Sequence, residues 1–269
     1  MHEAEDIVCD VVTTMKYVVR GEKATFHPGQ REKSYWPVDE HPVTIHDVRP
    51  IREQLSFDRN GFVVVDEPTD VTEFSGSQLE RYQRQTEALV QRLTGADKVV
   101  SFGPIVRTNA TGAHGHNQPA HGAHVDYGAR TVADFTRDLL PKAEAERRLL
   151  GRHMLLNVWR PIVMVESAPF AVCDASTVKR EDLFDSEVVG GLGDFNRRSL
   201  WGFNLAYDPG HRWYWVPHMQ PWEALVFKLF DSKSEAVQFT AHSAFEDPNT
   251  PPDAAPRQSI EVRTIAYLA

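Results

Sequence analysis

The stretch RQSIEVRTIAYL, residues 257–268, alternates polar and apolar side chains near the end of the sequence. Its polar residues recur at every second position: Arg257, Ser259, Glu261 and Arg263. Successive side chains of a β-strand point to opposite faces, so these four share one face, while Ile260 and Val262 lie on the other. Such a strand either packs its apolar face on helices and lines a ligand cavity with its polar face, or turns its polar face to solvent, as half-buried strands commonly do.

Upstream of this strand, the sequence from residue 152 onward is rich in further β-strand signals. Segments such as MLLNVW, LWGFNLAY and EALVFKLFD contain many β-branched and aromatic residues, and turn signals such as Asp208-Pro209-Gly210 separate them. Many short strands at close intervals predict a mainly β fold with flanking helices, a double-stranded β-helix or jelly roll. Helices are predicted over about 77–95, where Ser77 and Glu80 suggest a capping box, and over about 131–150, with a break at Pro141.

Neither a repeat nor a low-complexity linker divides the 269 residues, so the sequence predicts a single domain over 1–269. Within it, residues 1–100 are expected to be an N-terminal elaboration. Residues 101–269 carry the motifs described below and are expected to form the core that binds metal and co-substrate.

Composition narrows the classes of function. The net charge is −9, without a basic face that would bind a phosphate backbone, so a nucleic-acid partner is not expected. Cysteine occurs only at Cys9 and Cys173, too few for a secreted disulfide scaffold. The N-terminus carries acids ahead of its first apolar stretch, and no apolar run is long enough for a membrane span. We therefore expect a cytoplasmic protein, monomeric or homodimeric, that acts on a small molecule.

The clearest chemical motif is His124-Val125-Asp126, the only His-x-Asp in the chain. On an extended strand, residues i and i+2 point the same way, so the imidazole and the carboxylate converge. A second histidine from a distant strand would complete a facial triad, which holds Fe(II) and leaves three positions for a bidentate co-substrate and O₂. His242 is the first candidate because Arg257-x-Ser259 follows it fifteen residues later, and His211 is the alternative.

The order of motifs in the second half resembles that of the iron(II)- and 2-oxoglutarate-dependent oxygenases. The resemblance is to their hydroxylase/desaturase family, which includes cephalosporin 7α-hydroxylase-associated proteins, gibberellin desaturase-like proteins and fungal oxygenases of secondary metabolism. It covers roughly residues 120–269 and rests on these pieces: Asn157-Val-Trp-Arg-Pro161, the stretch from Pro209 to Pro217, Asp231-Ser232, and His242 through Arg257-Gln-Ser-Ile-Glu-Val-Arg263.

This resemblance implies an anchor for the distal carboxylate of 2-oxoglutarate. Arg257 is the first candidate, because a guanidinium fork matches a carboxylate bidentately, and Ser259 can add a hydroxyl from the same face. Arg263 is the second candidate. Lys228 is the third, because it alternates with Ala224, Val226 and Phe230 and is therefore expected to point into an apolar interior.

Further residues are predicted to surround the site or to line the substrate pocket: Asn157, Arg160, Tyr127, His211 and Trp213. Each has a structural alternative. Arg160 can form an ordinary salt bridge, and the Trp213-Tyr214-Trp215 run is more typical of a core. No residue beyond the metal ligands is expected to act as a catalytic acid or base.

The function predicted from these motifs is oxidation of a C–H bond, by hydroxylation or desaturation, of a small natural-product-like substrate, with release of succinate and CO₂. Two alternatives remain open at this point. One is a cupin-type metalloenzyme using His114 and His116, although no Glu follows these histidines at the usual short distance. The other is a non-enzymatic β-sandwich that binds a ligand.

Overall fold

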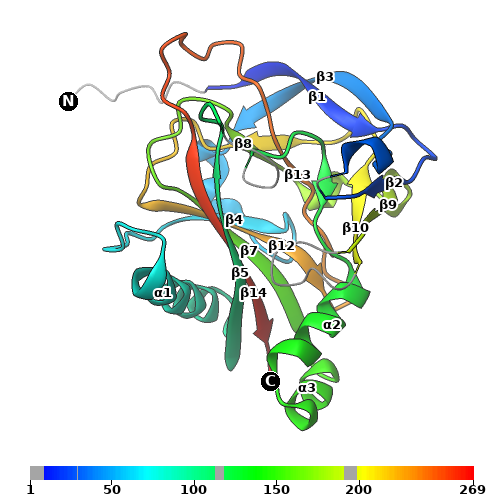
Figure 1. Cartoon of the computed structure of the whole chain (residues 1–269), viewed down its shortest axis with the longest axis vertical. Coiled ribbons are helices and arrows are strands. Elements are labelled where there is room, and N and C mark those ends of the chain that lie inside the picture. Colours follow the sequence, from blue (N-terminus) through cyan, green and yellow to red (C-terminus); the bar gives the residue numbers. More distant parts are fainter. Residues whose placement is uncertain (1–8, 29, 113–117, 191–198) are drawn as a thin grey trace.

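The computed structural model describes residues 9–28, 30–112, 118–190 and 199–269. Within these residues, two sheets face each other (Figure 1). The nine-stranded sheet has the order β1 (Val11–Val18), β3 (Val38–Asp47), β11 (Trp213–Trp215), β8 (Phe170–Cys173), β13 (His242–Ala244), β6 (His124–Val125), β10 (Leu200–Leu205), β9 (Leu183–Val188) and β2 (Ala24–Phe26). The five-stranded sheet has the order β4 (Phe62–Asp66), β12 (Glu223–Asp231), β7 (His153–Pro161), β14 (Gln258–Tyr267) and β5 (Lys98–Thr108).

A shared apolar core joins the two sheets. Phe227 and Trp159 of the five-stranded sheet pack in one buried cluster with Val172 of the nine-stranded sheet. The ring of Phe170 stacks on that of Trp159 at a centroid distance of 5.0 Å. Burial of these apolar faces against each other is the main force that holds the layers together.

The N-terminal residues supply strands to both sheets. β1 pairs antiparallel with β3, β3 runs parallel to β11, and β4 is the edge strand beside β12. Strands from the described residues before position 100 are therefore built into both layers by main-chain hydrogen bonds.

The helices lie where the sequence predicts them, with one difference in detail. α1 (Gly76–Thr94) covers the outer face of the five-stranded sheet and ends at Gly95, whose φ of 69° suits glycine (Figure 1). Its N-cap is Ser75, without a side-chain cap, so the expected capping box at Ser77 is wrong. The second helical region is split at Pro141 into α2 (Ala129–Leu139) and α3 (Lys142–Leu149), as predicted. In the described part of the chain, no helix has the length and apolar character of a membrane span.

β14 turns its polar face inward. Ile260 and Val262 pack beneath α1 against Tyr82 and Val71, on the outer side of the sheet. The polar residues of the alternate positions are at most 5% exposed: Arg257, Ser259, Glu261 and Arg263. Of the two interpretations of this strand, the structure selects the one in which its polar face lies between the layers.

Candidate metal centre

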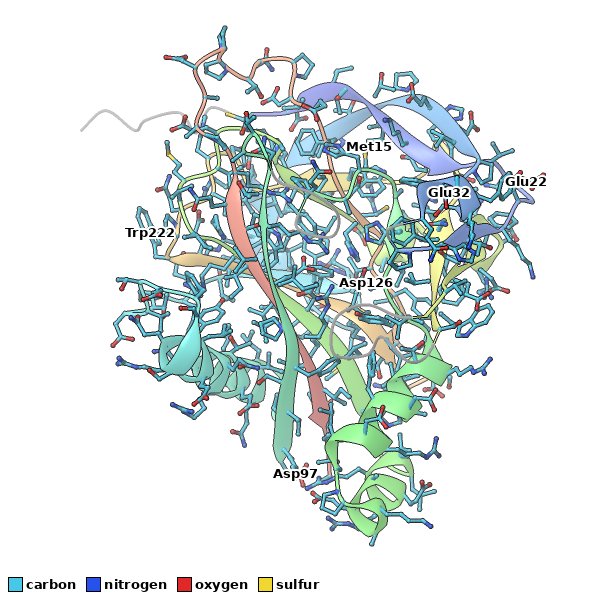
Figure 2. The ribbon with its side chains drawn as sticks, in the orientation of Figure 1. Met15, Glu22, Glu32, Asp97, Asp126 and Trp222 are labelled. Carbon is cyan, nitrogen blue, oxygen red and sulfur yellow. The ribbon has the colours of Figure 1, made fainter. Side chains whose placement is uncertain are left out.

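His124 and His242 face each other across neighbouring short strands of the nine-stranded sheet. β6 pairs antiparallel with β13, and the register places His242 opposite His124. Nε2 of His124 lies 3.4 Å from Oδ1 of Asp126, and Nε2 of His242 lies 3.9 Å from the same oxygen. One ligand atom from each side chain falls within 4.8 Å of the other two. The structure therefore brings the predicted trio together, and Figure 2 shows Asp126 near the middle of the molecule in that view.

The tautomers of both imidazoles follow from their hydrogen bonds. Nδ1 of His124 lies 2.7 Å from the carbonyl oxygen of Gly122, and Nδ1 of His242 lies 3.1 Å from that of Thr240. A carbonyl oxygen only accepts, so each Nδ1 carries a proton, and Nε2 is the atom that each ring would offer to a metal. Two imidazole lone pairs and one carboxylate form the donor set that Fe(II) takes in facial triads. The residues present therefore fit this metal.

The charges of the trio also suit a cation. Burial, together with the nearby His124, lowers the pKa of His242 to about 4, so this ring is neutral near pH 7. Burial acts in the same direction on His124, but its hydrogen bond to Asp126 reverses the shift and raises the pKa. Burial would raise the pKa of Asp126, yet Arg263 and both histidines hold it well below its usual range. A carboxylate is thus kept ionised in a largely buried position.

Arg263 orients this carboxylate. Its Nη2 donates to Oδ2 of Asp126 at 3.1 Å and to Oε1 of Glu261 at 2.8 Å, while Nη1 donates to the carbonyl oxygen of Gly103 at 3.1 Å. Glu261 also accepts from Arg107 at 2.8 Å, and although burial acts against ionisation, Arg107 and Arg263 lower its pKa to about 2. Arg263 was the second candidate for the co-substrate anchor, and its two terminal nitrogens are instead engaged by these carboxylates and by Gly103, while its buried Nε has no partner among the described residues.

A small cavity of about 10 Å³ adjoins the trio. Its remaining lining residues are Arg107, Ala120, Trp159, Phe170, Arg257 and Glu261. Arg257 is 1% exposed, and its guanidinium donates from Nη1 to the carbonyl oxygen of Ala168 at 2.6 Å. Burial, with a contribution from Arg107, lowers the pKa of Arg257 to about 9.

Around Arg257, three buried polar atoms have no hydrogen-bond partner among the described residues. They are Nε of Arg257, Oγ of Ser259 and Nε1 of Trp159. Buried donors are normally satisfied, because an unpaired one costs roughly 1–3 kcal/mol. A guanidinium with one unpaired N–H and two neutral donors without partners, next to a metal-ligand trio, are the groups that an anion with several acceptor oxygens would satisfy.

The side chain of Lys228 lies on the face of the five-stranded sheet that is turned away from the metal-ligand trio. A β-bulge shifts the register of β12 between Lys228 and Phe230, so Leu229 and Phe230 both pack into the core between the sheets. Lys228 instead shares the outer face with Val226, and its Nζ binds Asp231 at 2.5 Å. The alternation of Lys228 with Phe230 was therefore wrong, and this lysine is not among the residues that line the cavity.

His211 and Trp213 also lie away from the trio. Nε2 of His211 is 3.2 Å from Oδ2 of Asp182, and its ring stacks on Tyr17 at 6.5 Å. Trp213 donates from Nε1 to the hydroxyl of Tyr17 at 2.9 Å. Both belong to the packing on the far side of the nine-stranded sheet, and this supports His242 over His211 as the partner of His124.

The other predicted neighbours divide into two groups. Tyr127 lies beneath the guanidinium of Arg263 at 5.8 Å, and Asn157 is the register partner of Arg263 on β7, with an unpaired Oδ1. Arg160 is directed outward: it donates to the hydroxyl of Tyr82 at 3.1 Å and to the carbonyl oxygen of Pro221 at 2.9 Å.

The sequence did not single out Arg107 or Phe170. Arg107 stands on β5, whose residues carry no motif, and only its pairing with β14 opposite Ser259 reveals its position. Phe170 is the first residue of an ordinary apolar strand and reaches the cavity because β8 lies beside β13. Neither position has a signal in a single sequence.

As a class, a jelly roll with two histidines and one carboxylate between its sheets is a non-haem iron oxygenase fold and site. A family model described as an oxidoreductase/YMDC permease-like domain matches residues 13–267. An Fe(II)/2-oxoglutarate-dependent dioxygenase, nvfI of Aspergillus novofumigatus, is 31% identical over 259 residues, which cover 91% of this chain and 89% of that protein. The hydroxylase/desaturase efuI of Hormonema carpetanum is 27% identical over 285 residues, covering 96% and 95%.

A solved structure agrees with these relatives. The iron and alpha-ketoglutarate-dependent endoperoxidase NvfI superposes with a TM-score of 0.87 at 28% identity, over 97% of both chains. The chain therefore belongs to the oxidoreductase/YMDC permease-like family, and within it to the Fe(II)- and 2-oxoglutarate-dependent oxygenases.

These findings confirm the predicted fold class, the dioxygenase class, and Fe(II) and 2-oxoglutarate as cofactor and co-substrate. They support neither the cupin-type nor the ligand-binding alternative. His114 and His116, on which the cupin alternative depends, lie outside the described residues. The assignment of individual residues to iron and to 2-oxoglutarate remains a prediction.

Proposed function

We propose that this oxygenase binds Fe(II) through His124, Asp126 and His242 and oxidises a C–H bond of a small natural-product-like molecule by hydroxylation or desaturation. The observation that carries the assignment is the convergence of three ligand atoms within 4.8 Å, with both imidazoles held as Nδ1–H tautomers. The name hydroxylase/desaturase of a relative supports the reaction type. We also propose that the protein is cytoplasmic and monomeric or homodimeric.

The proposed site for 2-oxoglutarate is the polar end of the cavity. Arg257 would pair with the distal carboxylate, and the unpaired hydroxyl of Ser259 and indole N–H of Trp159 would complete its hydrogen bonds. Ser259 belongs to β14, Arg257 directly precedes that strand, and Trp159 belongs to β7. The five-stranded sheet would therefore hold the co-substrate. Iron bound with 2-oxoglutarate supplies the oxidising chemistry of this enzyme class.

The protein residues would fix the geometry and exclude water. The bond from Arg263 to Asp126 holds the ligand carboxylate, and the carbonyl oxygens of Gly122 and Thr240 hold the two rings. The side chain of His242 is 4% exposed, whereas those of His124 and Asp126 are 22% and 17% exposed. Substrate would therefore approach from the side of His124 and Asp126, and the buried side would stay free of bulk water.

Anaerobic titration tests this proposal directly. Adding Fe(II) and then 2-oxoglutarate to the metal-free protein is expected to give a visible charge-transfer band, because the keto acid chelates the bound metal. Absence of the band from well-folded protein would remove the proposed iron and co-substrate sites. Mass spectrometry of products then distinguishes gain of an oxygen atom, for hydroxylation, from loss of two hydrogen atoms, for desaturation.

Gly202 of β10 permits the backbone of Asp126 to come close. A Cβ atom at this position would lie 2.3 Å from the carbonyl oxygen of Val125 and 2.5 Å from that of Asp126. Gly202→Ala is therefore expected to displace Asp126 and to weaken Fe(II) binding at least about tenfold, the lower end of the effect of disturbed ligand support. Gly151→Ala is the control, since its nearest contact would be an ordinary 3.4 Å. Equal Fe(II) affinity of both folded variants would contradict the prediction.

A further inference from the structure

The segment of residues 232–241, called here the β12–β13 loop, leads directly into His242. It contains no helix or strand, yet Thr240 within it supplies the carbonyl oxygen that accepts the Nδ1–H of His242. The orientation of this imidazole therefore depends on how firmly the loop is held. Besides its contacts with the nine-stranded sheet, the loop is attached to β12 at Lys228 and Asp231, which do not line the cavity.

The bulge in β12 creates the attachment point. In a regular strand, residues i and i+3 point to opposite faces, so Lys228 and Asp231 would be separated by the sheet. The extra residue at the bulge lets Leu229 and Phe230 both enter the core and returns Asp231 to the face of Lys228. The side chains of Lys228 and Asp231 are each 0% exposed, and Nζ of Lys228 lies 2.5 Å from Oδ2 of Asp231.

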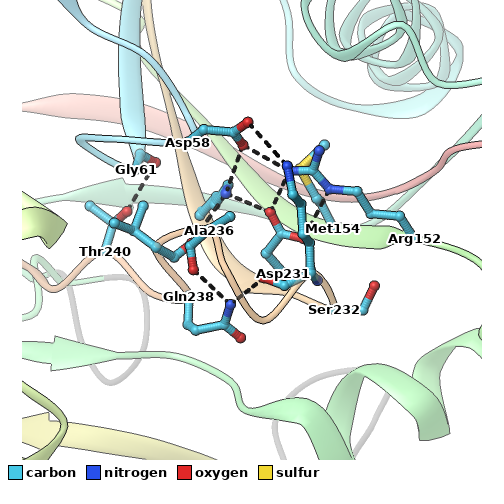
Figure 3. A network of polar contacts seen from close by, with 12 residues as sticks. Asp58, Gly61, Arg152, Met154, Asp231, Ser232, Ala236, Gln238 and Thr240 are labelled. Carbon is cyan, nitrogen blue, oxygen red and sulfur yellow. Dashed lines mark hydrogen bonds and ion pairs between the residues drawn. The ribbon is translucent and has the colours of Figure 1, made fainter.

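This ion pair holds the first part of the loop. Nζ of Lys228 donates to the carbonyl oxygen of Val237 at 3.1 Å, and Oδ1 of Asp231 accepts from the backbone N–H of Lys233 at 2.9 Å. Arg152 donates to Asp231 at 2.7 Å from the neighbouring β7 side (Figure 3). Asp58 adds a second carboxylate, 3.6 Å from Nζ of Lys228.

The backbone at Lys228 holds the end of the loop next to His242. The carbonyl oxygen of Lys228 accepts from the N–H of Thr240 at 2.9 Å. The carbonyl oxygen of Gly61 accepts both the N–H of Lys228 at 2.8 Å and the hydroxyl of Thr240 at 2.9 Å. Gly61 has a φ of 83°, and a Cβ there would lie 2.3 Å from Oγ1 of Thr240, so glycine permits this close approach.

We propose that Lys228 and Asp231 are positioning residues for the iron site, acting through the β12–β13 loop on His242. The proposal rests on the proposed role of His242 as an iron ligand. A buried ion pair adds little net stability compared with apolar residues of the same size, but it restricts geometry. Here it joins two points of a loop without regular structure, and the carbonyl oxygen at the end of that loop fixes the ligand tautomer.

The test compares Lys228→Met with Glu223→Gln in the full chain. Lys228→Met keeps the size of the side chain and leaves Asp231 paired with Arg152. Glu223→Gln weakens an ion pair at the other end of the same strand, between the buried carboxylate of Glu223 and Arg49. Fe(II) affinity is measured anaerobically at saturating 2-oxoglutarate from the charge-transfer band, and thermal unfolding of the metal-free proteins is followed by circular dichroism.

Lys228→Met is expected to weaken Fe(II) binding about 10- to 100-fold, the usual effect of removing support for a ligand, while Glu223→Gln binds like the wild type. Both variants lower the unfolding temperature. Wild-type Fe(II) affinity in Lys228→Met would overturn the proposal. If that variant does not fold, Thr240→Val decides, since it removes only the hydroxyl bond to Gly61: a weakened affinity supports the proposal and an unchanged one overturns it. A wild type that binds no Fe(II) overturns the proposed function itself.

Discussion

Asp126→Ala is expected to abolish turnover and to weaken Fe(II) binding by more than about 100-fold, since even residues that merely support ligands account for 10- to 100-fold. The substitution removes the one anionic donor of the trio. Two imidazoles remain, and neither supplies a negative charge to balance that of the metal. The ring of His242, whose pKa is lowered to about 4, is neutral near pH 7. The measurement is the anaerobic titration described above, with turnover assayed as succinate release.

His242→Ala should have the same effect, and His211→Ala is the matched control. Both histidines are buried near a carboxylate, His242 near Asp126 and His211 near Asp182. Loss of His211 should lower stability through Asp182 and leave the charge-transfer band intact. If His211→Ala removed the band and His242→Ala kept it, the third ligand would be reassigned.

Arg257→Met is the second substitution with a large expected effect. It should raise the KM for 2-oxoglutarate roughly 100-fold, because charge-assisted hydrogen bonds contribute about 1.5–3 kcal/mol each and about 1.4 kcal/mol corresponds to tenfold. Turnover at saturating co-substrate should fall much less. Arg257→Lys keeps the charge without the planar fork, so its KM for 2-oxoglutarate should lie between those of the wild type and Arg257→Met. Ser259→Ala should give a smaller increase, through the loss of one neutral donor.

The same substitution is not expected to destabilise the ligand-free protein. Within the described residues, Arg257 forms no salt bridge, and burial lowers its pKa to about 9, so the folded protein buries a cation at a cost. Arg257→Met should therefore keep or raise the unfolding temperature of the ligand-free protein. Arg160→Met is the control: it also leaves backbone carbonyl oxygens without a donor, but it is remote from the cavity, so the KM should not change. An unchanged KM in Arg257→Met would contradict the proposed anchor.

Much of the fold and the trio could be predicted from the sequence because local patterns encode them. The alternation in residues 257–263 indicated the strand, and the His-x-Asp spacing placed two side chains on one side. His242 was selected by its order relative to Arg257, and the register of β6 with β13 agrees with that choice. These features depend on strand periodicity, which a single sequence reveals.

The parts that could not be predicted depend on irregularity or on distant pairing. The bulge after Lys228 reverses the phase of β12, so the simple alternation with Phe230 put the lysine on the wrong face. Arg263 has the sequence character of an anion anchor, but its distance from Asp126 is set by the separation of two sheets. The position of Arg107 follows from its pairing with the last strand, which no local motif encodes.

The two layers contribute different halves of the proposed site. His124 and His242 belong to the nine-stranded sheet, while Ser259 and Trp159 belong to the five-stranded sheet, with Arg257 directly before β14. In the proposed complex, the co-substrate would connect the two sheets. One of its ends would chelate the metal, and the other would pair with Arg257. Apolar packing, such as that of Phe170 on Trp159, sets the spacing between the layers. That spacing would then determine the length of the co-substrate and favour a five-carbon keto diacid over shorter or longer ones.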